Sequence, residues 1–371
     1  MVGAALPTKH FGWRDRQPPF RLGRARIVGP MTVHSLRFHG PGDLRSEEVD
    51  LRPCGPGDVV VAVQACGVCG SDLHFLDGSA RTGHVPITLG HEIAGRIVES
   101  GDPSWMVDDE VVVAAGVTCG SCVACRSDRE MICERLAMTG IDFDGGLADK
   151  VVVPGSALLA RPSGVAAEVA ATAVDAGATA FHAVVCRGQV QTGDAVVIIG
   201  AGGLGSYGIQ FARALGAAPV IVADRDPAAL ARARELHADE TILVEPGTSI
   251  GRAVKLLTGG GVDRAIEFVG RAATLDAAVK SLRPGGTAVA VGVGTEPLTT
   301  LPPVLWARNE YALLGSFGSH RRDVEQVLAR LADGTLQTPV RDTIPLAGAQ
   351  EVIMAAANGT RPAAGRLIVI P

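Results

Sequence analysis

The chain has 371 residues, of which 47% are hydrophobic, 20% charged and 4% aromatic, and it carries a formal net charge of −5 at pH 7. This length exceeds what one hydrophobic core usually supports, so we expect two domains. The acidic balance and the scarcity of aromatic residues argue against a nucleic-acid binder, and no apolar run approaches the length of a membrane span.

Residues 1–30 differ from the rest of the sequence. They contain scattered Arg, Pro and Gly without clear periodicity, whereas regular patterning begins at Met31. We interpret them as an N-terminal extension: either a flexible or surface-draped arm, or the result of a start codon assigned too early. An organelle transit peptide is a further alternative, which the lack of serine richness and the presence of an acidic residue disfavour.

From about residue 33 to residue 153 the sequence reads as short strands broken by Gly and Pro, among them VVVAVQA, HEIAGRIVES, EVVVAA and KVVVP. This pattern predicts a compact β-rich domain. Its stretch CGVCGSDLHFLDG, residues 66–78, combines two thiols with a hydroxyl, two carboxylates and a histidine. A CxxC pair fits a redox dithiol, half of a zinc site or two buried thiols, so this stretch alone leaves all three open.

Candidate metal ligands follow in the same region. The stretch LGHEIAG supplies His91 and Glu92 at the start of an apolar strand, although a lone histidine is usually a core residue. Three such ligands and a water, with Cys69 as one of the three, would make an open catalytic zinc site.

A second set of candidate ligands is compact. The stretch CGSCVACRSDREMIC arranges four thiols as CxxCxxCx7C, at Cys119, Cys122, Cys125 and Cys133. Four thiols in one loop suit a closed tetrahedral zinc site, which stabilises the fold and does not react; an iron–sulfur site is the chemical alternative. Because six of the eight cysteines have such spacings and no apolar signal segment is present, we expect a reducing cytoplasm and no disulfide framework.

From about residue 193 strands and helices alternate, beginning with AVVIIG and LGSYGIQFARALG. Apolar strands between amphipathic helices predict a parallel sheet covered on both faces. Between them, residues 200–205 read GAGGLG, and Asp224 ends the next strand, as in a dinucleotide-binding turn. Asp224 can accept hydrogen bonds from ribose hydroxyls and would repel a 2′-phosphate, which favours NAD; Arg225 follows it and leaves NADP possible.

The motifs GVCGSDLH, GHE, the four-cysteine loop and GAGGLG, in this order and spacing, resemble the zinc-dependent alcohol dehydrogenases of the medium-chain dehydrogenase/reductase family. The resemblance covers nearly the whole chain from about Met31. It implies an α/β protein with two domains. A GroES-like β-rich catalytic domain, residues 31–184 and 320–371, is interrupted by a doubly wound Rossmann domain, residues 185–319. We also expect a homodimer or homotetramer.

The resemblance assigns a catalytic zinc to Cys69, His91 and Asp175. Asp175 stands where many members of the family carry Cys, and an oxygen ligand makes zinc a harder Lewis acid. Two zinc ions per chain are therefore expected, one in each constellation.

The resemblance also implies the roles of the neighbours of these ligands. Ser71 matches the hydroxyl that hydrogen-bonds the substrate oxygen, and His74 matches the outer end of a proton relay. Asp72 matches the carboxylate that orients the zinc-binding histidine. Glu92 matches a glutamate that lies close to the metal and can exchange onto it. Cys66, in contrast, matches no ligand and is expected to be a packed thiol.

For the cofactor, the resemblance adds contacts to those of the glycine turn. Thr179 matches a nicotinamide-contacting position, Leu204 lies behind the nicotinamide ring, Arg271 contacts the adenosine, and Arg366 binds the pyrophosphate. The predicted cofactor-binding residues are Gly200, Gly202, Gly203, Leu204, Gly205, Asp224, Arg225, Thr179, Arg271 and Arg366.

The resulting functional hypothesis is a zinc- and NAD-dependent oxidoreductase that transfers a hydride between an alcohol and NAD, giving an aldehyde or ketone. Ala115 stands four residues before the first loop cysteine, where several small-alcohol enzymes carry a large aromatic residue, so we expect a bulky, cyclic or branched substrate. One alternative is a dehydrogenase of a hydroxycyclohexenyl-carbonyl thioester, since residues 138–154 loosely resemble such enzymes. The other is a non-catalytic binding protein on the same fold.

Overall fold

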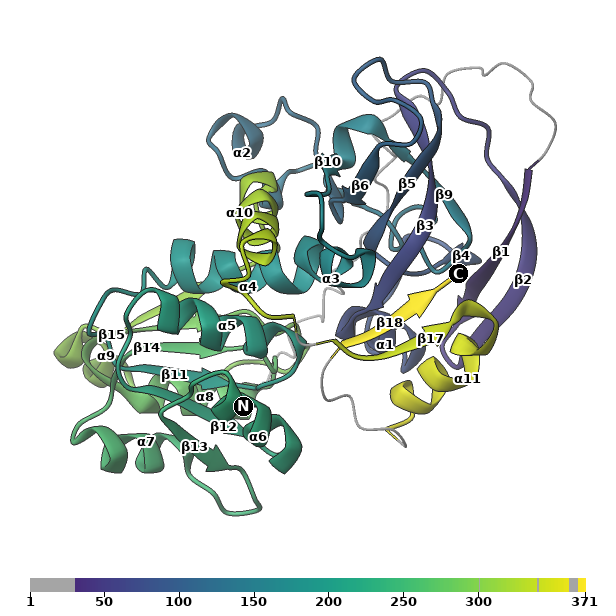
Figure 1. Cartoon of the computed structure of the whole chain (residues 1–371). Coiled ribbons are helices and arrows are strands. Elements are labelled where there is room, and N and C mark those ends of the chain that lie inside the picture. The colour runs from purple at the N-terminus through teal and green to yellow at the C-terminus, as the bar shows by residue number, and fades with distance from the viewer. Residues whose placement is uncertain (1–30, 300, 339, 360–365) are drawn as a thin grey trace, which may run out of the picture.

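The computed structural model describes residues 31–371 except 300, 339 and 360–365, so the expectations for residues 1–30 lie outside the described residues. A β-rich part contains both ends of the described chain, and a second part is built on a parallel sheet (Figure 1). A long interrupted helix joins the two.

The larger sheet of the β-rich part has seven strands in the order β10-β6-β5-β3-β18-β17, with β9 also paired to β3. Alternate residues of β3, Val59, Val61 and Val63, enter the core of this part. A smaller sheet has the order β2-β1-β4. The strands are β1 (Met31–Gly40), β2 (Asp43–Leu51), β3 (Asp58–Val68), β4 (Ile87–Thr88), β5 (Glu92–Ser100), β6 (Glu110–Val113), β9 (Lys150–Pro154), β10 (Leu158–Ala160), β17 (Val340–Pro345) and β18 (Arg366–Ile370).

The C-terminal strand β18 completes this sheet from the other end of the sequence. It pairs antiparallel to β3, with Val369 opposite Cys66, and parallel to β17. Helix α11 (Leu346–Ala357) packs against the short helix α1 (Gly70–Leu76) that follows β3. The β-rich part is therefore discontinuous in sequence.

A lobe projects from the β-rich part and carries the four-cysteine loop (Figure 1). It contains a two-stranded ladder and two short helical turns, and Cys122, Ala124, Cys133 and Leu136 form its own small apolar cluster. Its elements are β7 (Gly116–Val117), α2 (Val123–Arg126), η1 (Glu130–Ile132) and β8 (Ala137–Met138); the turn η2 (Gly155–Ala157) lies farther along the chain.

The second part is a six-stranded parallel sheet in the order β13-β12-β11-β14-β15-β16. Successive residues of β11 face two separate cores: Val196 and Ile198 pack in the core that includes residues of α5 and α6, Val197 and Ile199 in the core that includes residues of α7 and α8. Helices thus cover both faces, as the sequence predicts. The elements are β11 (Val196–Ile199), α5 (Gly203–Ala214), β12 (Val220–Asp224), α6 (Pro227–Glu235), β13 (Glu240–Leu243), α7 (Ile250–Thr258), β14 (Val262–Glu267), α8 (Ala272–Ser281), β15 (Leu282–Ala290), α9 (Pro303–Asn309) and β16 (Ala312–Gly315).

A helical stretch, residues 167–187, runs between the two parts and alternates α-helical and π-helical turns: α3 (Ala167–Ala171), η3 (Ala173–Gly177), α4 (Ala178–Phe181) and η4 (His182–Arg187). By length and composition, with a mean hydropathy of 1.5, it could cross a membrane, which the sequence reading did not anticipate. However, 78% of its apolar window is buried inside the protein, as in a core helix.

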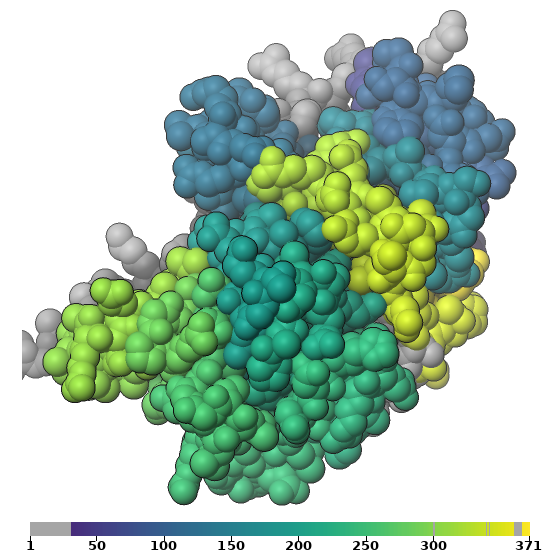
Figure 2. Space-filling model, turned by 60° about the vertical axis from the view of Figure 1, so that its left-hand side comes forward, coloured from purple at the N-terminus to yellow at the C-terminus, as the bar shows by residue number. Residues whose placement is uncertain are grey.

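Helix α10 (Arg321–Ala332) packs across this interrupted helix at its glycine. A Cβ atom on Gly177 would lie 2.7 Å from Cγ1 of Val327, so only glycine permits the observed approach. In Figure 2, the yellow-green surface of α10 lies between the blue surface of the lobe and the teal surface of the interrupted helix.

Candidate metal and cofactor sites

The three predicted ligands of the catalytic zinc converge from three different elements. Cys69 is the N-cap residue of α1, His91 directly precedes β5, and Asp175 lies in the π-helical turn η3. Oδ2 of Asp175 lies 3.3 Å from Sγ of Cys69 and 3.5 Å from Nε2 of His91.

These separations fit one ion held among the three atoms. Ligands placed tetrahedrally at about 2.1 Å from a zinc ion lie about 3.4 Å apart, and sulfur, nitrogen and carboxylate oxygen are the usual donors. A carboxylate oxygen of Glu92 completes a group whose candidate atoms all lie within 4.8 Å of one another. Cys69 and His91 are buried, whereas the Asp175 side chain is 18% exposed and thus accessible from a cavity.

The second ring nitrogen of His91 faces a buried carboxylate. Nδ1 of His91 lies 3.7 Å from Oδ1 of Asp72, and neither atom has a hydrogen-bond partner among the described residues. The other Asp72 oxygen accepts the N–H of Cys69 at 2.8 Å, which fixes this carboxylate at the start of α1. Burial disfavours the charged imidazolium, but Asp72 and Asp175 outweigh it, and the pKa of His91 is raised well above its ordinary value. The pocket therefore favours a positive charge.

Three further predicted residues, Ser71, His74 and Thr179, lie near the proposed zinc ligands or on the same helix as Cys69. Oγ of Ser71 lies 3.8 Å from Sγ of Cys69. His74, 44% exposed, lies with Nδ1 3.0 Å from Oγ of Ser79. Thr179, one turn after Asp175, donates a 2.9 Å hydrogen bond to Oδ1 of that carboxylate, a contact that sequence reasoning did not predict.

Cys66 lies apart from these ligands. It is fully buried in β3, and added Cβ atoms at Gly90 and Gly146 would lie 2.6 Å and 3.3 Å from its sulfur. Burial raises the pKa of this thiol well above its usual value, so it stays protonated and packed.

Glu92 and Arg366 form an ion pair, and both are buried. Arg366, the first residue of β18, also touches the glycine turn: a Cβ atom on Gly203 would lie 2.5 Å from its Cδ. Arg366, which is predicted to bind the pyrophosphate, thus contacts both Glu92, in the group of candidate metal ligands, and the N-terminus of α5. The sequence contains no local signal for this pairing, because the two residues are far apart along the chain.

The four cysteines of the lobe converge as predicted. Their sulfur atoms are separated by 3.9 Å (Cys119–Cys125), 3.5 Å (Cys122–Cys125), 3.8 Å (Cys122–Cys133) and 3.4 Å (Cys119–Cys133). Sulfur ligands at about 2.3 Å from a tetrahedral zinc lie about 3.8 Å apart, so the thiols fit a single closed site.

A cavity of about 500 Å³ lies between the glycine turn and the metal group. Gly205 packs so closely that a Cβ atom would lie 1.9 Å from the carbonyl oxygen of Gly200. Asp224 accepts N–H groups of Ala201 at 2.7 Å and Asp226 at 2.8 Å, which orients its carboxylate at the rim. All the predicted cofactor residues except Thr179 line this cavity: Gly200, Gly202, Gly203, Leu204, Gly205, Asp224, Arg225, Arg271 and Arg366.

A second cavity, of about 160 Å³, contains Asp175 and Ala115 in its wall. Half of the residues that line it have apolar side chains, among them Val117, Leu136 and Phe317. Its polar side comes from the lobe and the start of α10, with Glu130, Ser319, His320 and Arg321. Sequence reasoning missed these four residues, since no motif links the lobe to a helix so much later in the chain.

Comparison with known proteins agrees with this geometry. Residues 55–163 match the family model "Alcohol dehydrogenase GroES-like domain", and residues 203–333 match "Zinc-binding dehydrogenase". An NAD-dependent alcohol dehydrogenase of Sulfurisphaera tokodaii is 30% identical over 341 residues, which is 88% of this chain and 96% of the relative. An alcohol dehydrogenase of Geobacillus stearothermophilus is 33% identical over 304 residues, 80% of this chain and 88% of the relative.

Among solved structures, the alcohol dehydrogenase TADH from Thermus sp. ATN1 superposes with a TM-score of 0.83 at 31% identity, covering 91% of this chain and 99% of that one. An acetophenone reductase from Geotrichum candidum in complex with NAD gives 0.82 at 28% identity, covering 93% and 99%. The two matched domains, the relatives and the parallel sheet with its glycine turn together establish that this chain is a member of the zinc-dependent, NAD(P)-using alcohol dehydrogenases of the medium-chain dehydrogenase/reductase family.

Proposed function

We propose that the protein oxidises bulky alcohols, cyclic, aromatic or branched, with NAD as its preferred cofactor. The observation that carries this proposal is the cavity of about 160 Å³ that Asp175 and Ala115 line. An apolar cavity of about 150 Å³ holds a benzene molecule. Ethanol would leave most of this volume unfilled, and each buried methylene of a substrate contributes about 0.8 kcal/mol.

In this proposal Cys69, His91 and Asp175 hold the catalytic zinc, and Asp72 fixes the ring of His91. The 3.3 Å and 3.5 Å separations of the ligand atoms support the assignment. The four cysteines of the lobe hold the structural zinc, with no position left open for a substrate. Glu92, paired with Arg366, stands beside the first site as a carboxylate that can exchange onto the metal.

Protons move through the side chains of α1. When bound, zinc supplies a Lewis acid that lowers the pKa of the substrate hydroxyl, and NAD supplies the hydride acceptor. Ser71 hydrogen-bonds the substrate hydroxyl and accepts its proton while releasing its own hydroxyl proton along the path toward His74. His74 exchanges protons with solvent, which its 44% exposure permits.

The preference for NAD rests on the orientation of Asp224. Its two carboxylate oxygens each accept one backbone N–H, so the charge is fixed at the rim of the cofactor cavity. The remaining lone pairs can accept ribose hydroxyls, whereas a 2′-phosphate would meet a negative charge. Arg225 is exposed beside it and is the group through which NADP could also be accepted.

We further propose that the chain forms a homodimer or homotetramer in the cytoplasm. Val304 and Leu305 of α9 are 67% and 38% exposed, next to the edge strand β16, and such apolar surface is typical of a subunit contact.

Steady-state kinetics on ethanol, cyclohexanol and benzyl alcohol test the substrate proposal. The two bulky alcohols should give higher kcat/KM than ethanol, because they fill the apolar volume beside Asp175. Ala115→Phe should lower kcat/KM for both and leave ethanol little changed, while Ala115→Ser serves as a control of similar size. If ethanol is the best substrate, or if Ala115→Phe does not penalise the bulky alcohols, the cavity is not the substrate site.

A further inference from the structure

The cavity that contains Asp175 has a second carboxylate in its wall, that of Glu130. Glu130 begins the turn η1 of the lobe and does not belong to the group of ligand atoms around Asp175. A substrate whose reacting oxygen lies at the metal group would therefore meet Glu130 with a different part of its structure.

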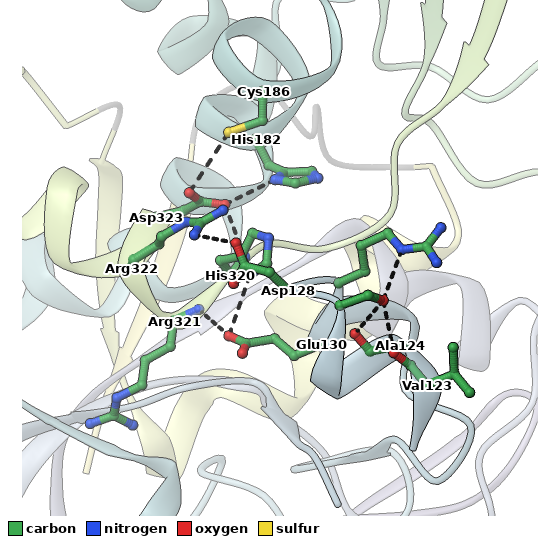
Figure 3. A network of polar contacts seen from close by, with 12 residues as sticks. Val123, Ala124, Asp128, Glu130, His182, Cys186, His320, Arg321, Arg322 and Asp323 are labelled. Carbon is green, nitrogen blue, oxygen red and sulfur yellow. Dashed lines mark hydrogen bonds and ion pairs between the residues drawn. The ribbon is translucent and has the colours of Figure 1, made fainter. Parts of the chain in front are cut away.

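Contacts with the start of α10 hold the Glu130 side chain in place. Oε1 accepts the backbone N–H of Arg321, the first residue of α10, at 2.8 Å, and lies 3.6 Å from Nδ1 of His320 (Figure 3). Within the described part of the chain, Oε2 accepts no hydrogen bond, and the side chain is 31% exposed. One oxygen is thus fixed, and the other is free to bind a ligand.

The other polar groups of this wall are already occupied or are hydroxyls. The guanidinium of Arg321 donates to the carbonyl groups of Ser156, at 2.9 Å, and Leu158. The ring of His320 faces Glu130 itself, with Nδ1 3.6 Å from Oε1, and its backbone N–H donates to Oδ2 of Asp323 at 2.9 Å. The side chain of Ser319 makes no hydrogen bond among the described residues and lines the cavity. Glu130 is consequently the strongest free acceptor on this side.

We propose that Glu130 is a specificity-determining residue that binds a hydrogen-bond donor, a hydroxyl or an ammonium group, carried by the substrate away from its reacting carbon. This inference rests on the proposed function, because it concerns the same cavity. The substrate class becomes a bulky alcohol with an apolar middle, which contacts Ala115 and Val117, and one polar end.

A purely structural role for Glu130 is the competing explanation, since its carboxylate joins the lobe to α10. Asp128 provides the matched control. It joins the same two elements through Arg322 and lies 4.0 Å from Nδ1 of His320, but it is 63% exposed and does not line the cavity. A role in holding the lobe would be shared by both carboxylates, whereas a role in binding would belong to Glu130.

The test compares substituted benzyl alcohols in two kinds of near-isosteric pair: hydroxy against methyl, and aminomethyl against ethyl. Each pair is measured once with the substituent at the 3-position and once with it at the 4-position. The unmodified holoenzyme should prefer the donor-bearing member of at least one pair by about 10-fold or more in kcat/KM, mainly through KM, as expected for a hydrogen bond to a charged group. Asp128→Asn should keep that preference.

Two substitutions of Glu130 then separate binding from structure. Glu130→Ala should abolish the preference and leave kcat/KM for the apolar members within a few fold. Glu130→Gln keeps an acceptor for the N–H of Arg321 and should fold normally; it should retain part of a hydroxyl preference and lose an ammonium preference.

Two outcomes overturn this inference: no preference in any pair for the unmodified enzyme, or a preference that survives Glu130→Ala. Failure of the proposed function is distinguishable, because then the methyl- and ethyl-substituted alcohols would themselves be no better than ethanol.

Discussion

The hydrogen bond between Thr179 and Asp175 offers a direct test of the proposed catalytic metal site. Thr179 is 7% exposed, and its hydroxyl donates to Oδ1 at 2.9 Å, leaving Oδ2 to face Cys69 and His91. Burial alone would raise the pKa of Asp175, but its contacts with His91, Cys69 and Thr179 lower it below its ordinary value. The donor therefore helps to keep the carboxylate charged and correctly rotated for a cation.

Thr179→Val replaces the hydroxyl with a methyl group of similar size and removes this donor. Partners that orient a metal ligand are worth about 10- to 100-fold in metal affinity. We therefore expect the variant to lose zinc from the site of Cys69, His91 and Asp175 and to keep the zinc of the lobe. In titrations against a competing chelator, the zinc dissociation constant of the first site should be about 10- to 100-fold higher.

Elemental analysis of the purified protein and chelator titration are the assays, and neither depends on turnover. Thr179→Ser, which keeps the donor, is the control and should bind zinc nearly as tightly as the unmodified chain. If Thr179→Val retains both zinc ions with unchanged affinity, the contact does not orient a ligand, and Asp175 would lose its strongest support as one.

Three further predictions concern the rest of the molecule. Cys122→Ser should leave one zinc per chain and lower the melting temperature or give insoluble protein, because structural zinc binding contributes on the order of 10 kcal/mol; full stability with lost hydride transfer would contradict a structural role. Asp224→Gly should shift the ratio of kcat/KM from NAD toward NADP, with Arg225 free to meet the 2′-phosphate, and a chain that already favours NADP would show the cofactor proposal to be wrong. Burial raises the pKa of the Glu267 carboxyl, so its protonated form contributes stability that is complete below about pH 4.5 and is lost as the pH rises through the raised pKa of the folded state. When the melting temperature is measured across the range from about pH 4 to pH 7, Glu267→Gln should therefore show a smaller change with pH than the unmodified chain.

Much of the fold is readable from the sequence because its signals are local. Apolar runs such as AVVIIG, followed by glycines and an amphipathic helix, dictate the parallel sheet, and Gly205 has no room for a side chain beneath Gly200. The lobe cysteines lie within fifteen residues of one another, so their spacing alone indicates a common site.

The proposed ligands of the catalytic zinc could not be identified from their spacing along the sequence alone. Nothing near Asp175 in the sequence identifies it as a partner of Cys69, and only the family resemblance brought the two together. The structure adds a physical reason: the π-helical turn η3 places this carboxylate within reach of Cys69 and His91. Its role as a ligand, like the domain boundaries at 184/185 and 319/320, stays a prediction; the first boundary falls inside the continuous helical stretch 167–187.

What could not be predicted depends on long-range packing. The ion pair of Glu92 with Arg366 and the contact of Glu130 with Arg321 each join residues that share no motif and lie on different elements. Their positions follow from how β18 and α10 pack against the first half of the chain, which periodicity does not encode.

The pairing of β18 with β3 has a consequence for the order of synthesis. Val369 is translated long after its partner Cys66, so the sheet that carries Cys69, a proposed metal ligand, is incomplete until β18 leaves the ribosome. The parallel sheet of β11–β16, in contrast, consists of neighbouring segments and has all its strands well before that point. During this interval the edge of β3 is open at residues 66–68, where other strands could join it, and the cofactor cavity still lacks Arg366 although its parallel sheet has all its strands.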